Sequence, residues 1–185
     1  MGDLTNTRRL RSVILREETS ACAASKGVVV VPEDTVDLAV VAYRDDEGWR
    51  LDTVPDDAVE DVEDLVDALR DVPSPSGALG MVAVDEDFFV LVRLRGDDAR
   101  MLLSDITAVD EWPLADSVAD VLDLPDPEDD DEPQPAGDLT MLADLGVSAI
   151  DLAVMLDDPD AYPDEVLSDI AQRLGFGDEF EALIG

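Results

Sequence analysis

The sequence contains no histidine and only one cysteine, Cys22, and these two shortages exclude several kinds of functional site. Catalysis by a Ser-His-Asp triad or a Cys-His pair needs a histidine as the base. Zinc sites are built mainly from histidine and cysteine, so the chain cannot assemble one of the usual ligand sets alone. A single cysteine forms no internal disulfide, which is typical of a reducing compartment. We therefore expect a cytoplasmic protein with no metal and no cofactor.

Basic residues are also scarce, with 12 Lys and Arg against 47 Asp and Glu and a formal net charge of −35. Residues 1–30 hold five basic and three acidic residues, whereas the other 155 residues hold seven basic and 44 acidic ones. Such a body repels the phosphates of nucleic acids and anionic lipid headgroups, so we predict direct binding to neither. It attracts and steers a basic protein partner. The alternative is that the charge only keeps the protein in solution.

Long apolar runs are missing as well. No segment approaches the roughly 18–20 apolar residues that a membrane span needs. The apolar run at residues 13–15 is too short for the core of a signal peptide. Residues 1–35 show no sustained hydrophobic periodicity. We therefore predict that residues 1–35 are a disordered N-terminal extension.

Short apolar runs separated by turn residues begin at residue 36 and predict five β-strands. The run VDLAVVAY (36–43) is apolar on both faces, whereas WRLDTV (49–54) alternates between apolar and polar residues. Three further segments have strand character: LGMVAV (79–84), FFVLVRLR (88–95) and ARMLLSDI (99–106). Because most of these strands are joined by short turns, we expect an antiparallel sheet.

Apolar residues at three- and four-residue steps predict helices within residues 59–69 and 114–122, packed on one face of the sheet. These patterns together predict an α+β fold, with an antiparallel sheet of about five strands and packed helices, followed by a small helical C-terminal region. The expected division is a disordered extension (1–35), an α+β domain (36–124), an acidic proline-rich linker (125–137) and a helical C-terminal region (138–185).

The C-terminal region carries clear helix boundaries. Ser148 and Asp151 have the spacing of a capping box. Pro163 suits the first turn of the next helix, and Gly175 suits its C-terminal cap. Asp178 is expected to cap a last short helix.

The stretch PDPEDDDEP (125–133) places five consecutive acidic residues between prolines. It has no central glycine, so it does not match the calcium loop of an EF-hand. A flexible acidic arm can present its charge to a basic partner. The alternative is a solvated spacer, because like charges repel and prolines stiffen the chain. The candidate partner-binding residues in this run are Glu128, Asp129, Asp130, Asp131 and Glu132.

Two other short patterns have both a functional and a structural interpretation. Trp112 precedes a predicted helix, and it is either an exposed anchor for a partner or a side chain that packs the helix onto the sheet. The segment DEDFFV (85–90) has a superficial likeness to an aspartyl-phosphate motif, but Phe89 stands where a threonine is expected. A hairpin turn that enters a strand is the favoured interpretation of this segment.

Five blocks of the chain, taken in order, point to a known family. They are VVAYRDDEGW (40–49), GALGMVAVDEDFFVLVR (77–93), LLSDITAVDEWPLA (102–115), AGDLTMLADLG (136–146) and YPDEVLSDIAQRLGFGDEF (162–180). Together they resemble a family of actinobacterial proteins, the tRNA adenosine deaminase-associated proteins. The resemblance runs from about Val36 to the C-terminus and leaves out residues 1–35.

The resemblance implies a context rather than a mechanism. The family is named for its association, chiefly of genes, with the enzyme that converts adenosine to inosine at the tRNA wobble position, and it supplies no catalytic residues to map. A zinc deaminase itself needs His/Cys/Cys or three cysteines with a glutamate, a set that this chain lacks. We therefore expect a non-enzymatic partner that binds a basic tRNA adenosine deaminase through an acidic surface. Two alternatives stay open: an enzyme that uses a carboxylate-bound magnesium ion, and a stand-alone acidic protein in an unrelated process.

Overall fold

The computed structural model describes residues 36–125, 127, 132–158 and 161–184. These residues belong to one compact unit, Val31–Gly185. The predicted N-terminal extension, residues 1–35, lies outside the described residues, and so do residues 128–131 of the acidic run.

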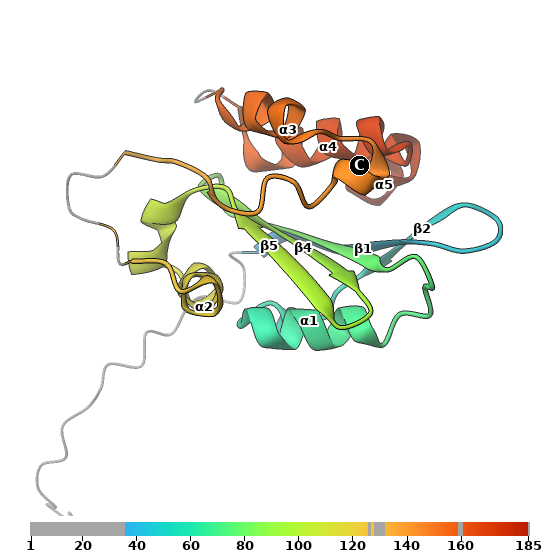
Figure 1. The fold of residues 1–185 in the computed structure, drawn as a ribbon, viewed down its shortest axis with the longest axis horizontal. Coiled ribbons are helices and arrows are strands. Elements are labelled where there is room, and N and C mark those ends of the chain that lie inside the picture. Colours follow the sequence, from blue (N-terminus) through green and yellow to red (C-terminus); the bar gives the residue numbers. More distant parts are fainter. Residues whose placement is uncertain (1–35, 126, 128–131, 159–160, 185) are drawn as a thin grey trace, which may run out of the picture. The chain divides into compact units, whose positions relative to one another are not determined.

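Six strands form one antiparallel sheet in the order β2-β1-β3-β4-β5-β6 (Figure 1). The strands are Val36–Arg44 (β1), Trp49–Thr53 (β2), Ala78–Val84 (β3), Phe88–Arg95 (β4), Asp98–Leu103 (β5) and Ala136–Gly137 (β6). The five predicted strands are present, and the α+β class is confirmed. The sixth, two-residue strand arises within residues 125–137, the stretch predicted as a linker, where it pairs with the end of β5.

Strands β3 and β4 are the centre of the core, because every residue of both except Arg95 is buried. Continuous apolar runs of this kind are typical of strands that are covered on both faces. The fifth strand ends at Leu103, three residues earlier than the sequence suggested. It ends there because Asp105 accepts a hydrogen bond from the amide of Thr107 and starts a short 3-10 helix, η2 (Ile106–Asp110).

Helices α1 (Val62–Arg70) and α2 (Pro113–Leu122) cover one face of the sheet (Figure 1). A short 3-10 helix, η1 (Asp56–Ala58), precedes α1. Each helix turns an apolar stripe to the sheet and acidic residues outward, as the three- and four-residue spacing predicted. The α1 stripe consists of the buried residues Val62, Leu65, Val66 and Leu69.

Helices α3 (Ala149–Leu156), α4 (Pro163–Leu174) and α5 (Gly177–Ile184) cover the other face (Figure 1). The 3-10 helix η3 (Ala143–Leu145) precedes them. The two helices predicted within residues 59–69 and 114–122 do pack on one face, and the helices of the C-terminal region cover the opposite face. The alternate strand residues that point away from α1 and α2 are also apolar, and the C-terminal helices bury them. Among the described residues no helix is long and apolar enough to cross a membrane.

The predicted helix boundaries of the C-terminal region are largely confirmed. Ser148 and Asp151 form the capping box at the start of α3. Pro163 is the first residue of α4, and Gly175 ends that helix in the left-handed conformation at φ 90°. The prediction for the last helix was off by two residues, because α5 begins at Gly177 and Asp178 lies within its first turn.

Candidate functional site

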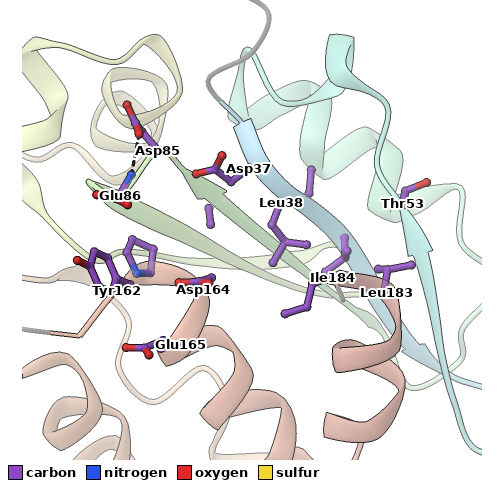
Figure 2. Close-up of a pocket in the computed structure, with 14 residues that line it drawn as sticks. Asp37, Leu38, Thr53, Asp85, Glu86, Tyr162, Asp164, Glu165, Leu183 and Ile184 are labelled. Atoms are coloured by element: carbon purple, nitrogen blue, oxygen red, sulfur yellow. Dashed lines mark hydrogen bonds between the residues drawn. The ribbon is translucent and has the colours of Figure 1, made fainter.

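A cleft of about 570 Å³ opens where the start of α4 and the end of α5 meet strands β1 and β2 and the turn between β3 and β4 (Figure 2). We call it the acidic cleft; it is lined by residues 37–40, 53, 83, 85, 86, 162–165, 183 and 184. Its volume lies within the range of about 300–1,000 Å³ that is usual for ligand-binding pockets. The cleft is therefore large enough to receive several side chains of a partner.

Among the described residues, five carboxylates and no basic side chain line the acidic cleft. They are Asp37, Asp85, Glu86, Asp164 and Glu165. All five residues are exposed. Within the part of the chain that the structure describes, none of them forms an ion pair, although ion pairs occur at several other carboxylates. Their charge is thus available to a ligand from outside.

Apolar side chains line the same cleft between the carboxylates. Leu38, Val40 and Ala83 are buried and belong to the core on the α3–α5 face. Tyr162, Leu183 and Ile184 reach the surface, with 50%, 39% and 42% of their area exposed. Figure 2 shows Leu183 and Ile184 on the α5 side of the cleft and Tyr162 on the α4 side. Exposed apolar groups beside unpaired charges are typical of a protein-binding surface.

Local structure places the carboxylates around the opening. Asp85 begins the β3–β4 turn at φ 48°, a left-handed conformation that aspartate tolerates better than most residues. Its Oδ1 accepts a hydrogen bond of 3.0 Å from the amide of Glu86. Across the cleft, Pro163 starts α4 and sets Asp164 and Glu165 in its first turn, where the helix dipole favours negative charge.

The chemistry of this lining suits a basic segment with an apolar anchor. Lysine or arginine side chains would pair with the rim, and an apolar side chain would cover Tyr162, Leu183 and Ile184. In the described ranges of the chain, no group of three or more Asp, Glu or Cys residues is arranged to hold a metal ion. No cluster of possible magnesium ligands among the described residues supports the alternative of a magnesium-dependent enzyme, which stays a hypothesis.

Of the residues proposed from the sequence as partner-binding, the two that the structure describes, Trp112 and Glu132, do not line the acidic cleft. Residues 128–131 fall outside the described structure, and Glu132 is exposed. Trp112 is partly buried just before α2, and its ring centroid lies 6.0 Å from that of Phe88. This placement fits the packing interpretation of Trp112. Partner binding by these residues stays a prediction.

The segment DEDFFV is a hairpin, as the structural interpretation predicted. Residues 85–87 form the turn between β3 and β4, and Phe89 is buried in the core. Two residues of this turn, Asp85 and Glu86, line the acidic cleft. Sequence reasoning missed the cleft because its carboxylates come from three separate segments, with no spacing that distinguishes them among 47 acidic residues.

Comparison with known proteins places the chain in a family. The family model described as "Rv3753c-like tRNA adenosine deaminase-associated protein" matches residues 37–177, which is more than half of the chain. The chain belongs to this family. The match to the Rv3753c-like family begins at the second residue of β1 and ends at the first residue of α5, so it covers all of the sheet except Val36.

A curated relative supports membership of the Rv3753c-like family. Protein Rv3753c of Mycobacterium tuberculosis (strain ATCC 25618 / H37Rv) is 38% identical over 155 residues, which cover 82% of this chain and 90% of the relative. The resemblance stated from the sequence is thereby confirmed, including its actinobacterial character. No solved structure matches the chain.

Proposed function

We propose that the chain is a non-enzymatic accessory protein that docks on a tRNA adenosine deaminase in the cytoplasm, and that the acidic cleft is its docking site. The family description supports the choice of partner, because it names association with a tRNA adenosine deaminase. The observation that carries the docking site is a cleft whose described lining has five carboxylates without an ion pair, no basic side chain and three exposed apolar residues.

Charge complementarity supports this pairing. An enzyme that binds tRNA must offer a basic surface to the phosphates of its substrate. The acidic cleft presents the opposite charge, so it attracts basic side chains at the edge of such a surface and speeds their encounter. Contact with Tyr162, Leu183 and Ile184 would then hold the complex, because buried apolar anchors contribute most of the affinity of an interface.

The test is the kinetics of binding between this protein and its cognate tRNA adenosine deaminase. We expect the variant D85N/E86Q/D164N/E165Q to associate more slowly than the unchanged protein at low salt, by about tenfold or more. The difference should shrink as salt is added, since the Debye length falls from about 10 Å at 0.1 M to about 3 Å at 1 M.

A matched control separates the cleft from the total charge. The variant E63Q/D64N/D116N/D120N removes the same number of carboxylates from the exposed sides of α1 and α2. It also contains first-turn acids, as the cleft variant does, so the effects on helix dipoles are similar. Equal slowing by both variants would contradict docking at the cleft, and no binding by the unchanged protein would contradict the partner itself.

The acidic run at residues 128–132 is proposed as an auxiliary steering element. Replacing it by Ser, Gly and Gln should slow association more than it speeds dissociation. Folding should be unchanged, because the replacement removes no apolar group. An unchanged association rate at low salt would leave the run as a spacer only.

The non-enzymatic part of the proposal has its own test. We expect less than stoichiometric zinc by elemental analysis and no inosine formed from tRNA without added deaminase, since the chain has no histidine and one cysteine. About one zinc per chain, or inosine formation by the protein alone, would contradict it. A rise in melting temperature with added magnesium would instead favour the alternative of a magnesium-dependent enzyme.

A further inference from the structure

A second cavity differs from the acidic cleft in the sign of its charge. Residues 31–185 contain seven arginines and no lysine. Three of these arginines, Arg93, Arg95 and Arg100, line one cavity of about 240 Å³ together with the carboxylates of Asp98 and Asp144 and with Thr140, Met141 and Ala143. We call it the arginine pocket. Almost half of the arginines in residues 31–185 therefore lie at one cavity, although the protein is strongly acidic.

The strand register brings the arginines together. Arg93 on β4 lies directly opposite Arg100 on β5, and Arg95 lies two residues further along the same face of β4. Like charges that face each other across an antiparallel pair destabilise the sheet unless something compensates them. An anion between the two strands would turn this unfavourable pair into a binding site.

Arg93 is held rigidly beneath the pocket. Only 3% of its area is exposed. Its Nη1 donates to the carbonyl oxygen of Ala78 at 3.1 Å, and its Nη2 donates to that of Ser76 at 2.9 Å. The Nε of Arg93 is buried without a hydrogen-bond partner among the described residues. Burial lowers the pKa of Arg93, but a guanidinium stays protonated at neutral pH, so a fixed and incompletely paired positive charge lies under the cavity.

The carboxylates near the pocket compensate these charges only in part. Asp144 shares a single oxygen, Oδ2, between Nη2 of Arg93 at 3.4 Å and Nη1 of Arg95 at 3.3 Å. Arg100 reaches Asp138 at 3.4 Å and Asp98 at 3.0 Å. Strong ion pairs of this type have donor–acceptor distances of about 2.7–2.9 Å. Arg95 and Arg100 are also about half exposed, so their remaining N–H groups are open to solvent.

We propose that the arginine pocket binds one phosphate group of a small ligand. Three guanidinium groups around a small cavity suit a tetrahedral oxyanion: Arg95 and Arg100 can donate N–H groups to it directly, and the buried Arg93 adds a fixed positive charge beneath it. The hydroxyl of Thr140 offers a further donor at the rim. The volume is below that of pockets for whole drug-sized ligands, so it suits a single anionic group. A polyanion such as RNA is disfavoured by the acidic surface outside the pocket.

The experiment is a titration of the full-length protein with inorganic phosphate and, separately, with AMP, at about 0.15 M salt, where the Debye length of about 8 Å screens the distant acidic residues. The readout is the NMR signals of the arginine Nε–H groups. We expect saturable shifts at Arg93, Arg95 and Arg100. Tighter binding of AMP would indicate an esterified phosphate as the ligand, and equal or tighter binding of inorganic phosphate would indicate the free ion.

Two double variants test whether the pocket is the site. R95Q/R100Q removes the two arginines that are about half exposed, and we expect it to weaken binding by at least about tenfold, since hydrogen bonds to charged groups are strong. R50Q/R173Q is the control, because it removes the same charge from two arginines of similar exposure elsewhere. Equal weakening by both variants, or no saturable binding by the unchanged protein, would overturn the proposal.

The variant D144N separates a binding site from a structural ion pair. If the pocket binds phosphate, removing the competing carboxylate should tighten binding by several-fold. If Asp144 serves only to hold Arg93 and Arg95 in place, D144N should lower the melting temperature and leave binding unchanged or weaker, which would contradict the proposal. The single variant R100Q is a second check, because among the described ion pairs Arg100 has none with Asp144. We expect R100Q to weaken phosphate binding without disturbing the ion pairs of Asp144, and unchanged binding would contradict the proposal.

Discussion

The two faces of the sheet are equally apolar, but they differ in what their covering helices leave open. On the α1–α2 face, side chains such as Leu65 and Val118 pack directly onto the strands and form one continuous core. On the α3–α5 face, an equally buried core continues into both cavities described above. Both cavities described above thus border the α3–α5 face.

The difference follows from how the chain covers each face. Helices α1 and α2 each lie next in sequence to strands of the same sheet, so short connections hold them in place. The second face is covered by a single C-terminal segment, α3 to α5, that follows β6 and is followed by no further strand among the described residues. Its helices leave the strand ends uncovered, at the β3–β4 turn on one side and around Arg95 and Arg100 on the other. Binding sites arise at such borders between a rigid sheet and the elements that cover it.

We expect the largest effect from removal of residues 138–185, which cover the α3–α5 face. The deletion would expose strand residues that are now fully buried on the α3–α5 face, among them Leu79, Met81 and Leu91. We expect cooperative thermal unfolding to be lost and a dye for exposed apolar surface to bind. Cooperative unfolding of the shortened protein would instead show that residues 36–124 are an independent domain.

Single core substitutions on the two faces should have similar, large effects. Phe176 is fully buried, with its ring centroid 4.7 Å from that of Trp49, and Leu65 is its fully buried counterpart under α1. We expect F176A to lower the free energy of unfolding by about 3–5 kcal/mol and L65A by about 2–5 kcal/mol. Urea unfolding followed by circular dichroism measures both. Two separate transitions in either variant would mean that the faces fold independently.

The capping box of α3 gives a smaller effect that depends on pH. The hydrogen bonds from the hydroxyl and the amide of Ser148 lower the pKa of Asp151. The ionised form of Asp151 therefore stabilises the fold above the ordinary aspartate pKa, and this contribution is lost as the pH falls through the lowered value. We expect S148A to cost about 1 kcal/mol at neutral pH and less in acid.

The measurement for the cap is a carboxyl NMR titration of Asp151 combined with urea unfolding at several pH values. S148T keeps a hydroxyl at the cap, so it serves as the control and should restore most of the stability. An unchanged Asp151 pKa in S148A would show that the capping box does not form in solution.

Removal of residues 1–35 should have the smallest effect. The family match begins at residue 37, and the sequence of this segment shows no periodicity. We expect a chain that starts near Thr35 to melt within a few degrees of the full-length protein. Loss of cooperative unfolding would show that these residues belong to the core of one of the two faces.

Local signals in the sequence predicted the elements well. The capping box at Ser148, the proline that begins α4 and the glycine that ends it each act within a few residues, so spacing alone identifies them. The burial of β3 and β4 on both faces was also present in the sequence, as unbroken apolar runs. The sequence patterns did not indicate which face the C-terminal helices cover; in the structure they lie opposite α1 and α2.

The two cavities could not be predicted from local sequence patterns. The acidic cleft depends on how the end of α5 and the start of α4 meet a hairpin turn some 80 residues earlier, which is a tertiary relationship. The arginine pocket depends on strand register, because a shift of one residue would turn Arg93 to the opposite face. The sequence pointed to the acidic run at residues 128–132 instead. A sequence shows how many acidic residues are consecutive, but it does not show which distant carboxylates lie close together in space.

The central claim, that the acidic cleft docks a tRNA adenosine deaminase, is tested most directly by hydrogen exchange of the protein alone and in the complex. We predict slower exchange in the complex in peptides that contain Asp85, Asp164 and Ile184, which line the cleft. Peptides from α1 and α2 should exchange at the same rate in both samples. Protection confined to α1 and α2, or to residues 128–132, would contradict docking at the acidic cleft.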